Sequence, residues 1–216
     1  MSIELYLSGF ITLAFAHFVA LLSPGVDFFI IISNSSKYGK LSGIISSFGI
    51  ASANLVYILL ALFGIGLIRD NIILFTAIKV IGAIYLLYIG FLLLRASKRD
   101  LFHTIENNEL LKMSKKLILK HFGVGFLSAL LNPKNSIFYF TMFSISVQND
   151  TPFEIQSFYA LWMFSAVLLW DIFIVYLVTN KKSKKFMQKY SNKIEKISGA
   201  ILIILASSIM ISTLGN

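Results

Sequence analysis

The sequence predicts an all-α integral membrane protein with six transmembrane helices in two inverted three-helix repeats, whose first and fourth spans are broken by prolines. Three observations lead to this prediction: the composition, the length of the apolar segments and a phrase present in both halves. Of the 216 residues, 57% are hydrophobic and 13% are charged, and the mean hydropathy is +0.81. A soluble domain carries about 25% charged residues, so this chain is expected to lie in hydrocarbon.

The apolar segments have the length of membrane spans. A helix needs about 20 apolar residues to cross the bilayer, and its backbone hydrogen bonds are satisfied within the segment. The first segment carries Glu4 and no Lys or Arg, which favours a retained span over a cleaved signal peptide. The six expected spans are approximately Ile3–Leu22 continuing into Val26–Ile32, Leu41–Ile68, Ile72–Leu94, Phe122–Val147, Ser157–Val178 and Ile197–Leu214.

Two short phrases occur in both halves of the chain. ALLSP at 20–24 returns as ALLNP at 129–133, and KVIGAI at 79–84 returns as KISGAI at 196–201. Because each repeat holds an odd number of spans, the second repeat enters the membrane from the opposite side. We therefore expect one transporter domain over residues 1–216, with repeat one at about 1–95, a cytoplasmic linker at about 96–120 and repeat two at about 121–216. Paired broken spans in corresponding positions indicate a transporter substrate site.

The basic residues lie on one predicted side of the membrane. Sixteen of the 19 Lys and Arg residues fall within 37–40, 95–120 and 181–196, whereas the opposite side holds only Arg69. The positive-inside rule places those three connections in the cytoplasm and both termini outside. Anionic lipid headgroups are the expected partner of the basic loops. The net charge of +9 does not indicate nucleic-acid binding, because no segment outside the membrane is long enough to form a domain for it.

The first proline break has the chemistry of an anion site. Pro24 has no N–H and interrupts the helix, while Gly25 adds backbone freedom. A helix that restarts here presents free N–H groups and a positive dipole end, which attract a carboxylate. Asp27 in the first turn of that helix is a candidate for binding an ammonium group or a proton. The structural alternative for Asp27 is an N-terminal cap on that helix, and the two roles can coexist.

The second break repeats this geometry with a different charge. Asn132 and Pro133 precede Lys134, which is a candidate for holding a carboxylate; snorkelling or pairing with Asp27 is the structural alternative. Asp171 lies in the middle of the fifth span, where a carboxylate costs about 3 kcal/mol. We therefore expect Asp171 to face the protein interior or a wet cavity. A transport role is favoured over helix packing for Asp171, although we expect the loss of Asp27 to impair transport more.

Three further polar residues lie at membrane depth. His17 precedes the first break and is a candidate for relaying protons with Asp27, although a packing hydrogen bond is the commoner role of such a histidine. Asn54 lies on a second span rich in small residues and is a candidate for lining a cavity or for helix packing. Lys79 is expected to snorkel to the interface.

Enzymatic and metal functions find little support in the sequence. There is no Cys, which excludes thiolate sites and disulfides. No metalloprotease pattern, serine nucleophile elbow or cofactor motif is present, so we expect neither an enzyme nor a cofactor. Two Asp and one His make a poor metal site compared with the dense carboxylate or His clusters of metal exporters. An ion or metal exporter, or a binding or structural membrane protein without transport, remains the alternative function.

Three motifs carry a resemblance to a known family. Pro24-Gly25-Val26-Asp27, the segment Lys79–Gly90 and Leu130–Lys134 resemble the first, third and fourth spans of the lysine exporter/RhtB family of bacterial amino-acid exporters. The order, spacing and length match over essentially the whole chain, although Val26 stands where the family often has a second Pro. The resemblance implies export of amino acids or their derivatives across the bacterial cytoplasmic membrane, driven by a proton or ion gradient. It leaves open which amino acid is exported and whether the protein forms a homo-oligomer.

Overall fold

The computed structural model describes residues 3–23, 25–69, 71–98, 114–148 and 151–214. In these ranges the chain forms α-helices and no strands, which confirms the prediction of an all-α protein. The helices are α1 (Ile3–Leu22), α2 (Val26–Tyr38), α3 (Lys40–Arg69), α4 (Ile72–Leu94), α5 (Lys115–Leu130), α6 (Pro133–Ser146), α7 (Phe153–Thr179) and α8 (Lys181–Leu214).

Several of these helices can cross a membrane. Among the described residues, α3, α4, α7 and α8 are long and apolar enough to do so, and the pair α1–α2, bent by 55°, forms a fifth candidate. Helices α5 and α6 have 16 and 14 residues, so each alone is shorter than the roughly 20 residues that a span requires. All-helical membrane architecture is thus observed, while the sixth span and the inverted repeat remain predictions.

The helices are interrupted at both copies of the proline phrase, 20–24 and 129–133. Helix α1 ends at Leu22 and α2 begins at Val26. Between them Gly25 is extended (φ −99°, ψ −168°) and gives α2 no side-chain cap. Pro24 itself lies outside the described residues.

The second interruption is capped. Helix α5 ends at Leu130 and α6 begins at Pro133, whose missing N–H is not needed in a first turn. The Oδ1 atom of Asn132 accepts a hydrogen bond from the Lys134 backbone N–H (3.0 Å) and so caps α6. The two breaks therefore share a phrase but differ in how the following helix begins.

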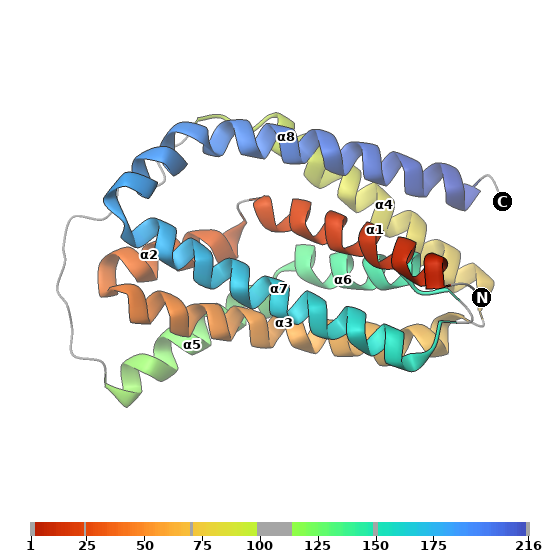
Figure 1. The fold of residues 1–216 in the computed structure, drawn as a ribbon, viewed down its shortest axis with the longest axis horizontal. Helices are drawn as coiled ribbons and strands as arrows, with labels where there is room; N and C mark the ends of the chain where they lie inside the picture. Colours follow the sequence, from red (N-terminus) through yellow and green to blue (C-terminus); the bar gives the residue numbers. More distant parts are fainter. Residues whose placement is uncertain (1–2, 24, 70, 99–113, 149–150, 215–216) are drawn as a thin grey trace.

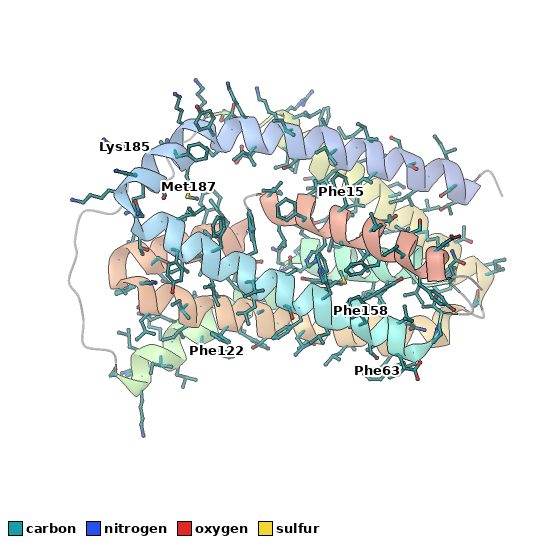
Figure 2. All side chains as sticks on the ribbon, viewed as in Figure 1. Phe15, Phe63, Phe122, Phe158, Lys185 and Met187 are labelled. Atoms are coloured by element: carbon teal, nitrogen blue, oxygen red, sulfur yellow. The ribbon has the colours of Figure 1, made fainter. Side chains whose placement is uncertain are left out.

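Helix α3 lies at the centre of the packing, with α2, α5, α6 and α7 against it, while α4 runs along α8 (Figure 1). Large apolar side chains are exposed on the outside of the bundle: Phe15, Phe63 and Phe158, labelled in Figure 2, are each about half exposed or more. Such a surface suits lipid contact.

The two ends of the bundle differ in charge. The first turn of α1 and the last turn of α8 lie at one end, and the lysine-bearing first turns of α5 and α8 lie at the other (Figure 1). The turn between α2 and α3, flanked by Lys37 and Lys40, lies with them. The basic connections predicted from the sequence thus gather at one end.

Candidate functional site

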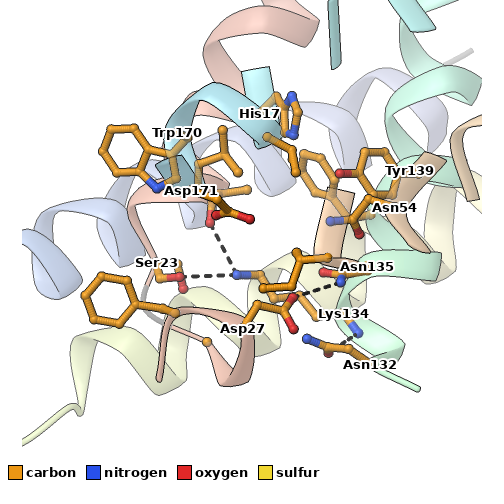
Figure 3. A pocket seen from close by; sticks show the side chains of 17 residues that line it. His17, Ser23, Asp27, Asn54, Asn132, Lys134, Asn135, Tyr139, Trp170 and Asp171 are labelled. Carbon is orange, nitrogen blue, oxygen red and sulfur yellow. Dashed lines mark hydrogen bonds between the residues drawn. The ribbon is translucent and has the colours of Figure 1, made fainter. Parts of the chain in front are cut away.

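The two helix breaks border one cavity, with a volume of about 60 Å³ (Figure 3). Residues from α1, α2, α3, α6 and α7 line it together with the residues of both breaks. Of the candidates chosen from the sequence, His17, Gly25, Asp27, Asn54, Asn132, Lys134 and Asp171 line this cavity. Pro24 lies outside the described residues, and Pro133 is the first residue of α6 without lining the cavity.

One wall of the cavity is electropositive. The uncapped start of α2 offers the N–H groups of its first turn and the positive end of the helix dipole. The Lys134 ammonium group lies nearby, 3.8 Å from the position that a Cβ on Gly25 would occupy. Lys134 Nζ donates to the carbonyl oxygens of Ala20 (3.2 Å) and Ser23 (3.5 Å). A carboxylate is the group that this wall would attract.

Asp27 is fixed by the second half of the chain. Its Oδ1 accepts a hydrogen bond from Ser128 Oγ (2.7 Å), and its Oδ2 accepts one from Asn135 Nδ2 (3.1 Å). Asn135 also donates to the Ala129 carbonyl (3.2 Å), which belongs to the repeated phrase. The Asp27 carboxylate therefore ties α2 to α5 and α6, and both of its oxygens already have donors.

Asp171 is held differently. Its side chain on α7 is only 7% exposed, and within the described part of the chain its Oδ2 has no hydrogen-bond partner. Asn54 Oδ1 and His17 Nδ1, which belong to residues lining the same cavity, are likewise unpartnered among the described residues. An unsatisfied buried polar group costs about 1–3 kcal/mol, and more when it is charged. Two such acceptors beside a cavity are suited to a ligand that brings N–H donors.

Aromatic rings surround the His17 imidazole. The ring centroids of Phe138, Tyr139 and Trp162 lie 5.5, 5.8 and 5.6 Å from that of His17. His17 is buried, at 1% exposed. These rings fix its orientation, so that its unpartnered nitrogen has a defined position.

Several residues of the site were not chosen from the sequence. Ser128 and Asn135 hold Asp27, and the Tyr57 hydroxyl donates to the Leu130 carbonyl at the end of α5, where the helix leaves carbonyls unpaired. A signal for Asn135 was available, because it is a polar residue two positions after Pro133 in an apolar segment. Lys79, in contrast, lies outside the cavity, with its ammonium group 4.3 Å from the centre of the Phe75 ring.

Comparison with known proteins places the chain in a family. A family model described as LysE type translocator matches residues 18–213. The chain belongs to this family. The resemblance noted in the sequence is thereby confirmed. No solved structure shows a significant match to the chain.

Curated relatives extend over nearly the same length. The chain is 29% identical to the uncharacterized membrane protein YrhP of Bacillus subtilis (strain 168), over 83% of this chain and 88% of that protein. It is 28% identical to the threonine efflux protein of Escherichia coli (strain K12), over 94% of this chain and 98% of that protein. The threonine efflux protein of Salmonella typhi is also 28% identical, with the same coverage. This LysE type translocator is thus similar over most of its length to proteins named for efflux.

Proposed function

We propose that this protein is a secondary transporter that exports amino acids or their derivatives across the bacterial cytoplasmic membrane. The observation that carries the proposal is the cavity between the two breaks, whose lining combines a positive wall with a buried carboxylate oxygen that has no hydrogen-bond donor among the described residues. The naming of two relatives as threonine efflux proteins supports the same class of substrate.

The charges of the cavity suit a zwitterion. We place the substrate carboxylate at the first turn of α2 and the Lys134 ammonium group. Its own ammonium group lies toward Asp171 Oδ2 and Asn54 Oδ1, the acceptors that lack donors among the described residues. In this arrangement each charged group of the substrate meets an opposite charge in a region of low dielectric, where an uncompensated charge is costly.

The coupling is proposed to use a proton or another ion. After the substrate ammonium group leaves, the Asp171 carboxylate needs a new positive partner, and a proton can take that place. His17, whose Nδ1 is unpartnered within the described residues, and Asp27 are the neighbouring groups that can exchange protons with it. An exporter that alternates between substrate and proton at one carboxylate is an antiporter.

The fold is proposed to contain six spans, with α1–α2 and α5–α6 as corresponding broken spans. Under the two-fold symmetry of an inverted repeat, α3 corresponds to α7 and α4 corresponds to α8. The observed packing of α3 on α7 and of α4 on α8 supports this pairing. The same symmetry converts the pair α2–α7 into the pair α6–α3. Both pairs are in contact, which supports the correspondence as well.

The proposal is tested by measuring intracellular amino acids in cells that are fed dipeptides. Cells expressing the protein should hold less of the exported amino acid than cells with an empty vector. Lys134→Gln, which removes the positive charge from the cavity, should abolish the difference. Lys79→Gln is the matched control, because Lys79 also lies in an apolar segment but outside the cavity. Equal amino-acid levels with and without the wild-type protein, across all amino acids supplied, would contradict the proposal.

A further inference from the structure

A second cavity lies beside the first and has the opposite character. Its volume is about 310 Å³, and its walls come from α1, α2, α7 and the first half of α8. The lining is almost entirely apolar and includes Leu22, Phe28, Trp170, Leu177, Phe186 and Met187. We call it the α7–α8 groove.

The first half of α8 covers this groove with one face. Ser183, Met187, Ser191 and Ile194 line it and recur at intervals of three or four residues, which places them on one side of a helix. Met187 is buried, at 9% exposed.

The opposite face of the same helix is basic. Lys181, Lys182 and Lys185 are exposed, and Figure 2 shows Lys185 at the end of α8 where it meets α7. Such a division is that of an amphipathic helix lying at a membrane surface. Here the apolar face borders the groove, and Met187 on this face also packs in a buried cluster with Ile174 and Val178 of α7.

We propose that the α7–α8 groove binds one anionic phospholipid of the surrounding leaflet, with an acyl chain in the groove and the phosphate headgroup at the lysines of α8. The apolar walls offer water too few hydrogen-bond partners for stable filling, whereas hydrocarbon gains contact with them. Charge complementarity selects the headgroup, because Lys182 and Lys189 lie one helical turn before and after Phe186, which lines the edge of the groove. A zwitterionic lipid makes the same acyl-chain contacts in the groove, but the lysines attract its headgroup less strongly.

The bound chain lies next to the polar cavity. Phe28 and Trp170 line both the groove and the cavity, so two side chains separate the acyl chain from the candidate substrate site. Trp170 precedes Asp171 directly in the sequence. The lipid site itself requires no substrate, so its test is independent of the proposed export.

Trp170 provides an internal reporter of the groove. The chain has two Trp residues, so Trp162→Phe leaves Trp170 as the only one. This variant is reconstituted in phosphatidylcholine vesicles that contain increasing fractions of brominated phosphatidylglycerol or brominated phosphatidylcholine, whose bromines quench Trp fluorescence on contact. Quenching by brominated phosphatidylglycerol should saturate at a mole fraction roughly tenfold or more below that needed with brominated phosphatidylcholine. Identical quenching curves for the two lipids would overturn the proposal.

Variants separate the headgroup from the chain. In the Trp162→Phe background, replacing Lys181, Lys182 and Lys185 by Gln should abolish the preference for phosphatidylglycerol. The matched control replaces Lys115, Lys116 and Lys120 by Gln, which removes the same charge from exposed positions on α5; the preference should persist. Ser191→Phe, which fills the groove, should remove the saturable quenching by either lipid. Equal loss of preference in both triple variants, or saturable quenching that survives Ser191→Phe, would mean that a diffuse basic surface binds the lipid.

Discussion

At the scale of single residues, the two cavity aspartates are in different states. Both oxygens of Asp27 have donors, whereas Asp171 Oδ2 has none among the described residues. We therefore propose Asp171 as the carboxylate that receives a substrate ammonium group or a proton. This proposal differs from the expectation drawn from the sequence, in which the loss of Asp27 is the more damaging.

We therefore predict that Asp171→Asn lowers export more than Asp27→Asn does. A hydrogen bond to a charged group contributes about 1.5–3 kcal/mol, so export by Asp171→Asn should fall roughly ten- to hundredfold. The measurement is amino-acid efflux from preloaded cells at matched expression. Glu154→Gln serves as the control, because this exposed carboxylate starts the same helix. Wild-type efflux by Asp171→Asn would show that this carboxylate is structural.

The contacts of Asp27 lead to a second prediction. Ser128→Ala removes the shorter of its two hydrogen bonds and leaves the Asn135 bond in place. Because one donor remains, efflux should fall only about three- to tenfold, in line with the roughly 1 kcal/mol of a single hydrogen bond. Ser128→Thr keeps a hydroxyl and should retain more activity than Ser128→Ala. Equal efflux by the Ala and Thr variants at a reduced level would mean that shape, and not the hydrogen bond, matters at this position.

The sequence was sufficient to select the charged residues of the cavity but not their contacts. Charges at membrane depth stand out in an apolar chain, which is why Asp27, Lys134 and Asp171 could be chosen. Asn135 could have been chosen for its place after Pro133, but its contact with Asp27 and the role of Ser128 depend on the register of α5 and α6 against α2, more than 100 residues away in sequence. A small polar residue in an apolar helix is as common in packing as in function.

At the scale of the helices, close approach depends on glycine. A Cβ on Gly199 of α8 would lie 2.6 Å from the Gly90 carbonyl oxygen of α4, and one on Gly90 would lie 2.8 Å from that of Gly199. The two backbones are thus in direct contact. Gly199 belongs to the second repeated phrase, and its equivalent Gly82 lies tightly against the Thr141 side chain.

This contact predicts opposite effects for two glycine substitutions. Gly199→Ala should destabilise the protein by about 1–3 kcal/mol, because backbone atoms of α4 must move. Gly123→Ala on α5 should instead be neutral or stabilising by up to about 1 kcal/mol, since its Cβ would meet nothing within 4 Å. Thermal unfolding in detergent, followed by size-exclusion chromatography, measures both. A melting temperature for Gly199→Ala at or above the wild-type value would contradict the close packing of α4 on α8.

Helix lengths show where pattern analysis of the sequence reached its limit. The position of each break was predicted, because proline in an apolar run interrupts a helix. The cap on α6 and the missing cap on α2 were not, since they depend on the side chain and the local backbone at Asn132 and Gly25. The fourth apolar segment is divided between α5 and α6, so neither piece alone has the length of a span.

At the scale of the whole molecule, the predicted topology has an observable basis in charge. Helices α5 and α8 both begin with lysines at one end of the bundle, and α1 begins and α8 ends at the other (Figure 1). Each lysine near a membrane surface favours the cytoplasmic side. The lysines therefore favour a cytoplasmic position for the same end of the bundle in both halves of the chain. The predicted inverted repeat requires this agreement.

The last prediction is therefore that both termini lie outside the cytoplasm. Fusions to green fluorescent protein, which fluoresces in the cytoplasm, and to alkaline phosphatase, which is active outside it, are placed after Lys116, Lys189 and Asn216. The first two positions should give fluorescence without phosphatase activity, and the third should give phosphatase activity without fluorescence. The reason is that Lys116 and Lys189 lie in basic connections, while an even number of spans returns the chain to its starting side. Fluorescence at Asn216 would contradict the predicted topology. With an odd number of spans between the termini it would contradict the inverted repeat of three spans each, and with a cytoplasmic N-terminus it would contradict the predicted orientation.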